Sequence, residues 1–331
     1  HLQSASDVAA FMILPEPGKL RSSVLNTNGK DRWLSVCQIG QEKDDRDPPW
    51  TDEDVKAFAR EQAGVPGLDV ELISSSIWRV SRQVASDFRS CRVFLVGDAA
   101  HRFPPSGGFG LNTGIQDAHN LAWKLAFVLN DWAKESLLDT YDVERRPIAE
   151  SNADFSVGNG LRFPAAADAV LEGSPDNIAF RINDVDNHLH SIGQALGFTY
   201  EAGAVIPDGT ARPARDSRIY TPNDRPGSRF PHIWLDLSRT QSTLDWFDKE
   251  FVLVSGPMGQ TWQDAVTKVS TKLKVPLISR TLDKVEREDG LLMGLRGAVL
   301  VRPDGHVAWR CPYMPSDPVA ELAGVMTRIL G

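Results

Sequence analysis

Residues 96–114 read VGDAAHRFPPSGGFGLNTG and combine one carboxylate, two adjacent prolines and a cluster of glycines. The apolar, β-branched run 92–96 at the start of this tract predicts a short buried strand. Apolar residues then recur at helical spacing, which predicts a helix over 112–129. A strand, a glycine-rich crossing and a helix N-terminus in succession can hold an anion or a cofactor, because a helix begins with unpaired amides. The alternative is a simple turn.

The composition is that of a globular protein and narrows the classes of partner. A chain of 331 residues is long enough for two or three domains, and a net charge of −8 argues against a nucleic-acid-binding surface. Cys37, Cys91 and Cys311 are isolated, so neither a disulfide framework nor a zinc site is predicted. No membrane span or secretion signal is apparent, and we expect a cytoplasmic protein.

The segment that precedes the tract has mixed α+β character. Asn28-Gly29 is typical of a hairpin turn, and Thr51 is a good N-cap before an acidic first helical turn. The predicted elements are a strand over 32–39, a loop over 42–49, a helix over 51–62 and a strand over 73–82.

After the tract, the pattern is helical and then changes near Tyr200. We predict a helical segment over 137–159 that is broken at Pro147, a third helix over 176–196 and an extended connection over 207–231. The last part predicts a strand over 251–254, a helix over 261–273, a hairpin over 298–309 and a helix over 318–330. This order is typical of a thioredoxin-like domain. Since it has no redox cysteine pair, we expect a structural or lid role.

Several motifs, read together, resemble one enzyme family. The runs Gly97-Asp98-Ala99-Ala100-His101, Pro104-Pro105 and 107–112 resemble the GD motif of class A flavoprotein monooxygenases, the FAD-dependent aromatic hydroxylases. The runs 116–125 and 141–147 are similar to the same family. The run 226–232 resembles a signature of its phenol-hydroxylase-like branch, which carries a C-terminal thioredoxin-like domain. The resemblance covers essentially the whole chain.

The resemblance implies an α/β and α+β fold, namely an incomplete, Rossmann-like FAD-binding monooxygenase fold followed by a thioredoxin-like domain. It assigns 1–90 to a substrate-domain sheet, 91–200 to the C-terminal portion of the FAD-binding domain, and 201–331 to a linker with the thioredoxin-like domain. The family's G-x-G-x-x-G loop, which binds the ADP half of FAD, has no counterpart in this sequence, and neither has its Asp-Gly element. We therefore expect that residue 1 begins within the substrate-domain region and that a segment has been removed upstream.

The same resemblance assigns roles to residues of the tract. Asp98 matches the residue that holds the ribityl chain of the flavin, and the helix N-terminus would stabilise negative charge on the flavin. The alternatives are that Asp98 is only a cap and that the glycines serve only a tight turn. The implied cofactor-binding residues are Gly97, Asp98, Gly107, Gly108, Gly110, Leu111 and Asn112.

Residues around the tract are candidates for the substrate chamber. Pro105 matches a residue whose backbone faces flavin and substrate, so we assign it the catalytic role of shaping the chamber. The substrate candidates are Trp78, Val80 and Phe103, although an aromatic residue in an alternating strand is often a core residue. We expect His101 and His119 to be hydrogen-bonded structural residues and Arg229 and His232 to pin the connecting segment.

The implied activity is hydroxylation of a phenolic or polyketide-type aromatic substrate. The enzyme would use FAD as cofactor, O2 as the source of oxygen and NAD(P)H as reductant. The alternative is a truncated relative that has lost FAD and catalyses redox-neutral cyclisation or isomerisation, or only binds a ligand or partner chain. The expected partners are a small aromatic substrate, a second copy of the chain, or a complementing N-terminal segment that covers the strand 92–96.

Overall fold

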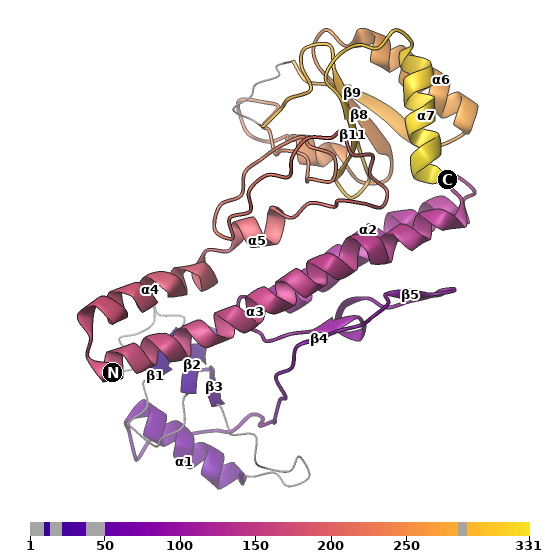
Figure 1. Ribbon diagram of the computed structural model, residues 1–331. Helices are drawn as coiled ribbons and strands as arrows, with labels where there is room; N and C mark the ends of the chain where they lie inside the picture. Colours follow the sequence, from indigo (N-terminus) through magenta and orange to yellow (C-terminus); the bar gives the residue numbers. More distant parts are fainter. Residues whose placement is uncertain (1–9, 14–21, 38–49, 284–289) are drawn as a thin grey trace. The chain divides into compact units, whose positions relative to one another are not determined.

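The computed structural model describes residues 10–13, 22–37, 50–283 and 290–331 (Figure 1). The chain divides into two compact units, residues 1–79 and 80–331, and each is considered by itself.

The first unit contains a small antiparallel sheet and one helix. The sheet has the order β1-β2-β3, with β1 at Ala10–Ile13, β2 at Ser22–Asn26 and β3 at Trp33–Cys37. The predicted hairpin turn is confirmed, because β2 pairs with β3 and Gly29 has a φ of 70°. Helix α1 (Asp52–Ala63) begins with the predicted cap at Thr51. The predicted loop 42–49 lies outside the described residues.

The predicted strand over 73–82 is wrong. These residues have no regular secondary structure, and the side chains of Ile73 and Trp78 are 71% and 62% exposed. A strand needs a neighbouring backbone to satisfy its amides and carbonyls, and no described segment pairs with this one. Pairing starts only at β4 (Gln83–Val84), which lies antiparallel to β7 (His101–Arg102).

The predicted buried strand over 92–96 is also wrong in length and burial. The structure has the two-residue strand β6 (Val93–Phe94), which pairs antiparallel with β5 (Arg89–Ser90). Val93 is 64% exposed. An apolar run is buried on both faces when strands flank it and other elements cover the sheet, but among the described residues β6 pairs only with the two-residue strand β5.

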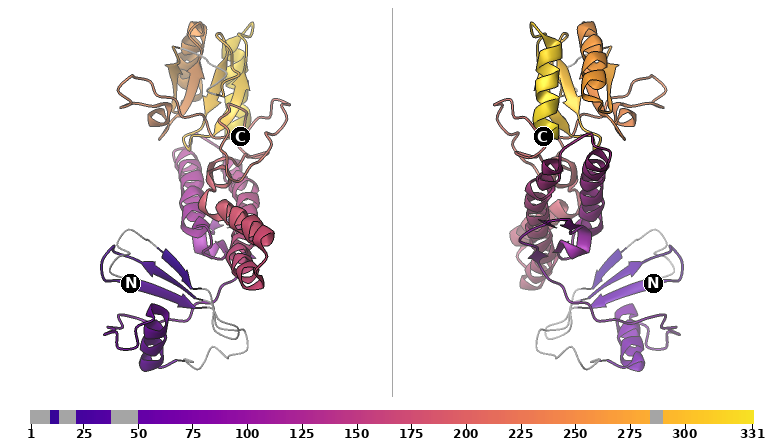
Figure 2. Two further views of the ribbon diagram at one scale, coloured as in Figure 1. Left: turned by 90° about the vertical axis from the view of Figure 1, so that its left-hand side faces the viewer. Right: turned by 90° about the vertical axis from the view of Figure 1, so that its right-hand side faces the viewer.

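Two long helices carry the middle of the second unit. Helix α2 (Phe109–Leu129) packs against α3 (Thr140–Glu172), and the two lie side by side in Figures 1 and 2. The short helix η3 (Glu135–Asp139) connects them, and α4 (Pro175–Leu189) and α5 (Ile192–Leu196) follow α3.

The predicted break at Pro147 is wrong, because α3 continues through it. Proline removes one backbone hydrogen bond and disfavours the helical conformation of the preceding residue. The residues beside it outweigh this cost, since Glu144, Arg145 and Ile148 are all buried, the first two in ion pairs. Tertiary contacts therefore maintain the helix across Pro147.

The C-terminal part is a four-stranded sheet with the order β11-β10-β8-β9. Strands β8 and β9 are parallel and connected through α6, and β10 is antiparallel to β8 and to β11. The connecting segment 207–231 has no helix and only isolated bridges, as predicted. Strand β9 was not predicted. The bounds are β8 Phe251–Ser255, α6 Gln260–Leu273, β9 Leu277–Thr281, β10 Ala298–Val301, β11 Val307–Cys311 and α7 Pro318–Leu330.

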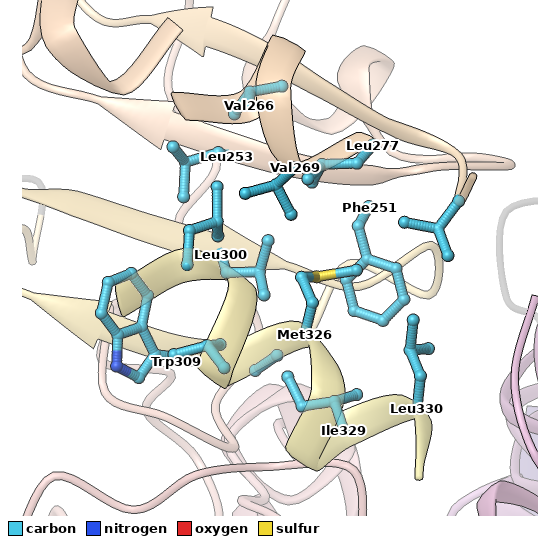
Figure 3. Packing of buried hydrophobic residues seen from close by; sticks show 14 of the residues in the cluster. Phe251, Leu253, Val266, Val269, Leu277, Leu300, Trp309, Met326, Ile329 and Leu330 are labelled. Carbon is cyan, nitrogen blue, oxygen red and sulfur yellow. The ribbon is translucent and has the colours of Figure 1, made fainter. Parts of the chain in front are cut away.

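Helices α6 and α7 cover one face of this sheet. Their apolar residues, including Val269 and Met326, pack against Leu253 and Leu300 of the strands (Figure 3). Trp123 and Phe127 of α2 belong to the same cluster, so the sheet domain and the long helices share a core. None of the described helices combines the length and the apolar composition that a membrane crossing requires.

Candidate functional site

The tract starts with a close approach between two glycines. Gly97 has a φ of 59° and opens the short helix η2 (Gly97–Ala99). A Cβ on Gly114 of α2 would lie only 3.1 Å from the Cα of Gly97. A side chain at position 114 would therefore push the loop away from the helix. This contact holds the exposed residue Asp98 beside the first turns of α2.

The N-terminus of α2 carries no side-chain cap. The helix begins at Phe109, three residues before the predicted start, and its N-cap Gly108 has a φ of 71°. The amides of Phe109, Gly110 and Leu111 therefore have no carbonyl partner within the helix. The first turn contains no acidic residue to neutralise the positive end of the helix dipole.

The glycines of the tract differ in purpose. A Cβ on Gly107 would lie 2.7 Å from Asn159 Nδ2 and 2.9 Å from the Phe109 ring, so the fold itself requires a glycine there. A Cβ on Gly108 or Gly110 would meet nothing within 4 Å. The turn alternative thus explains Gly107 and, through its φ of 71°, Gly108 as well, whereas open space lies over Gly108 and Gly110 at the helix end.

Pro105 and Asn112 lie on either side of this open end. Pro105 is exposed, and its carbonyl accepts a hydrogen bond of 2.9 Å from the amide of Gly108. Asn112 is the fourth helical residue, so its amide belongs to the hydrogen-bond ladder of the helix, and its side chain donates to the Gly108 carbonyl at 2.8 Å. The amides without a helical partner are therefore those of residues 109–111, and that of Asn112 is not among them.

The substrate candidates occupy different environments. Phe103 is buried, stacks on His101 at 5.0 Å between ring centroids and packs with Phe109 and Ala153. Trp78 belongs to the first unit, and Val80 begins the second. Trp78 and Val80 are 62% and 57% exposed. Phe103, which is itself a residue of the tract, thus belongs to the core that supports it.

A cavity of about 400 Å³ lies beside the first turns of α2. It is lined by Gly107, by residues of α2, by Asn152 of α3, by residues of α4, of α5 and of the link between them, and by Arg218. The lining consists of Gly107, Phe109, Asn112, Thr113, Gln116, Asn152, Leu189, His190, Ser191, Ile192, Ala195 and Arg218.

His101 is a hydrogen-bonded structural residue, as predicted. Its Nε2 lies 2.7 Å from Oδ2 of Asp117, which also accepts from the amide of Gly97 at 3.3 Å. Arg145 donates to the other carboxylate oxygen at 2.8 Å. Burial by itself raises the pKa of Asp117, but His101 and Arg145 outweigh it and lower the pKa below its usual value. His119, in contrast, is exposed on α2.

A buried charge cluster next to this anchor was not predicted from the sequence. Glu144 accepts hydrogen bonds from Lys124 at 2.8 Å and from both terminal nitrogens of Arg302 at 2.8 and 2.9 Å. Arg302 also pairs with Asp304. All four side chains are almost completely buried. A signal was present, because Asp117, Asn120 and Lys124 recur at helical spacing on the buried face of α2.

The charge cluster shifts the pKa values of its members. Burial by itself raises the pKa of Glu144, but the charges of Arg302 and Lys124 outweigh it and lower the pKa to about 2. Burial lowers the pKa of Lys124 to about 8 against the opposing attraction of Glu144.

The residues of the tract fit one end of a flavin. The ring system of a reduced flavin carries negative charge, which suits an uncapped helix N-terminus, and the open space over Gly108 and Gly110 admits a flat group. The exposed carboxylate of Asp98 is an acceptor for sugar-like hydroxyls. No group of three or more His, Cys, Asp or Glu side chains in the described part is arranged to hold a metal ion.

Comparison with known families gives the same picture. Residues 2–156 match the FAD binding domain family, and residues 223–331 match the family described as aromatic-ring hydroxylase, C-terminal. The chain is 38% identical to the tetracenomycin A2 monooxygenase-dioxygenase of Streptomyces glaucescens, over 95% of this chain and 55% of that protein. It is 32% identical to phenol 2-monooxygenase of a Pseudomonas species, over 90% of this chain and 55% of that protein.

Solved structures agree with these relatives. The flavin-dependent monooxygenase PieE in complex with FAD and substrate matches with a TM-score of 0.82 and 31% identity, over 97% of this chain and 62% of that one. A ternary complex of aklavinone-11 hydroxylase with FAD and aklavinone matches with a TM-score of 0.78 and 27% identity, over 99% of this chain and 65% of that one. The chain spans about half the length of the curated relatives it matches.

These matches confirm the mixed α/β fold and the resemblance found in the sequence. The division into segments 1–90, 91–200 and 201–331 stays a prediction. The chain thus combines a match to the FAD binding domain family with a match to the C-terminal family of aromatic-ring hydroxylases, and its relatives are aromatic hydroxylases and monooxygenases.

Proposed function

We propose that the protein takes part in FAD-dependent, NAD(P)H-driven hydroxylation of a phenolic or polyketide-type aromatic substrate. The observation that carries this proposal is the uncapped N-terminus of α2 beside the exposed carboxylate of Asp98. The names of the relatives support it, since they include phenol and polyketide-type monooxygenases. They also disfavour the alternative of redox-neutral chemistry.

In this proposal, bound FAD would supply the redox chemistry by which NAD(P)H and O2 add one oxygen atom to the aromatic ring and release the other as water. Asp98 accepts hydrogen bonds from the hydroxyl groups of the ribityl chain. The amides of Gly110 and Leu111 face the flavin and stabilise negative charge on its pyrimidine side. Gly108 and Gly110 admit the flat ring because they carry no side chain.

Pro105 then shapes the wall between flavin and substrate, and Phe103 supports that wall from the buried side. Trp78 and Val80 remain substrate candidates. Excluding water from the chamber would protect the reactive form of the cofactor from decay. We also propose a cytoplasmic location, and a second copy of the chain or a complementing N-terminal segment as partner.

Turnover under ¹⁸O2 tests the proposal. The full-length protein, FAD, NADPH and a panel of phenols and hydroxylated polycyclic aromatics are incubated, and products are analysed by mass spectrometry. We expect a product in which one ¹⁸O atom has been added and NADPH is consumed in equal amount. A product that is isomerised or cyclised without gain of oxygen would instead support the redox-neutral alternative.

A further inference from the structure

The turn between β10 and β11 of the C-terminal domain enters the charge cluster of the two long helices. Arg302 and Asp304 lie in this turn, and Arg302 binds Glu144 of α3 with both terminal nitrogens. Ala204 lies just before the connecting segment. Its carbonyl lies 3.5 Å from Nη1 of Arg302, and its amide donates to Glu144 at 2.7 Å. The C-terminal domain is thus joined to α3 by buried charges as well as by a shared core.

The contacts continue from this turn along α2. Asn120 Nδ2 lies 2.7 Å from Oε2 of Glu144, 3.3 Å from Asp304 and 3.4 Å from the hydroxyl of Tyr200. Arg145 Nη1 donates to the same hydroxyl at 3.1 Å. Tyr200 therefore connects the charge cluster to Arg145, and its side chain also stacks against His306 of the same turn.

The last contacts reach the loop that carries Asp98. Arg145 binds Asp117, and Asp117 holds the amide of Gly97 and the ring of His101. These two residues flank Asp98 on either side. A continuous set of polar contacts thus runs from Arg302 to both ends of this loop.

These contacts couple the positions of the residues they join, because a buried polar group that loses its partner has no water molecule to replace it. Arg145, Glu144 and Arg302 are fully buried, and a buried charge that loses its partner costs several kcal/mol, so each group fixes the position of the next. The loop is also constrained by the close approach of Gly97 to Gly114 and by the two-residue strands β6 and β7 on either side.

We infer that the β10–β11 turn of the C-terminal domain positions the Asp98 loop through this network, with Arg302, Tyr200 and Asp117 as positioning residues. The consequence for the cofactor rests on the proposed function, in which Asp98 binds the ribityl chain. The C-terminal domain would then influence the proposed flavin site through this network.

Hydrogen exchange tests this inference, because it reads the loop without any cofactor. The C-terminal domain offers a matched pair of variants. Arg302→Met breaks the network, whereas Arg310→Met removes another buried arginine, 6% exposed against 0% for Arg302, that pairs with Asp208 and Asp224 outside it. Tyr200→Phe is the mildest variant, since it removes one hydroxyl and keeps the ring.

We expect Arg302→Met and Tyr200→Phe to speed exchange of the amides in 97–101 by about fivefold or more, a factor that corresponds to roughly 1 kcal/mol. Exchange in β8 of each variant is the internal reference. Arg310→Met should leave the loop within about twofold of wild type, even where it lowers the melting temperature as much. Equal acceleration by the two arginine variants, or wild-type exchange in Tyr200→Phe, would overturn the inference. If Arg302→Met does not fold, the Tyr200→Phe result decides.

FAD affinity then separates the two proposals. Weaker FAD binding in Tyr200→Phe, together with faster loop exchange, supports both. Faster loop exchange with unchanged FAD affinity supports the positioning network and contradicts the role of Asp98 in the cofactor site.

Discussion

Among single residues, Gly97 and Gly114 set how closely the Asp98 loop approaches α2. Replacing glycine by alanine inside a helix ordinarily stabilises a protein by about 0.5–1 kcal/mol. Gly110→Ala should show this gain, because its Cβ meets open space. Gly114→Ala should instead be neutral or destabilising, since its Cβ would lie 3.1 Å from the Cα of Gly97. Urea denaturation of both variants checks the difference, and an equal gain in both would contradict the packing described.

The lowered pKa of Glu144 predicts an acid limb in the stability profile. Its pKa is about 2 in the folded protein and 4.5 in an unfolded chain. The unfolded state therefore binds more protons between these values, so the contribution is complete above pH 4.5 and is lost as the pH falls toward 2. The shift corresponds to about 3 kcal/mol.

Chemical denaturation from pH 6 to pH 2.5 measures this effect. Glu144→Gln should be less stable at pH 6, because Arg302 and Lys124 lose their buried partner, and its stability should fall less steeply with acid than that of wild type. Parallel pH profiles for the two proteins would show that Glu144 does not carry the acid limb.

Residue patterns in the sequence revealed one half of the site chemistry and missed the other. The tract around Asp98 was recognisable because its residues are close together in the chain. The charge cluster was not, because Glu144 pairs with Arg302 over a separation of 158 residues, which no local periodicity records.

Among the elements, helix α3 contains two internal prolines, Pro147 and Pro164. Proline within a helix costs about 3 kcal/mol relative to alanine, part of which is offset because proline also restricts the unfolded chain. Pro147 is exposed and its ring packs against no core, so Pro147→Ala should stabilise the protein by about 1–2 kcal/mol. Thermal unfolding checks this value. Pro318→Ala is the matched control and should give no gain, because Pro318 lies at the first position of α7, where proline is well tolerated.

The long elements were predictable and the short strands were not. Helices α2, α6 and α7 and the β10–β11 hairpin have apolar periodicity and turn residues that specify them locally. The run 73–82 has the alternation of a strand but no partner among the described segments, and β9 has a partner although its sequence gave no clear signal. Strand pairing depends on neighbours that a local pattern does not contain.

At the scale of the whole molecule, the C-terminal domain has the strand order of a thioredoxin-like fold but lacks a redox-active cysteine pair. Cys311 is buried in the core, and burial raises the pKa of its thiol, whereas Cys91 is exposed. We predict that iodoacetamide modifies Cys91 in the native protein and Cys311 only after unfolding. Peptide mass spectrometry locates the label. Rapid native labelling of Cys311 would contradict the structural role of the domain.

In our proposal, Asp98 and the open end of α2 form the flavin site. Titration with FAD, followed by flavin fluorescence, compares wild type with Asp98→Asn. The control is Asp264→Asn, which changes an exposed carboxylate on α6. We predict that Asp98→Asn weakens FAD binding by about tenfold or more, since hydrogen bonds to a charged acceptor contribute about 1.5–3 kcal/mol, and that Asp264→Asn binds like wild type. Equal affinity of all three proteins for FAD would contradict the claim.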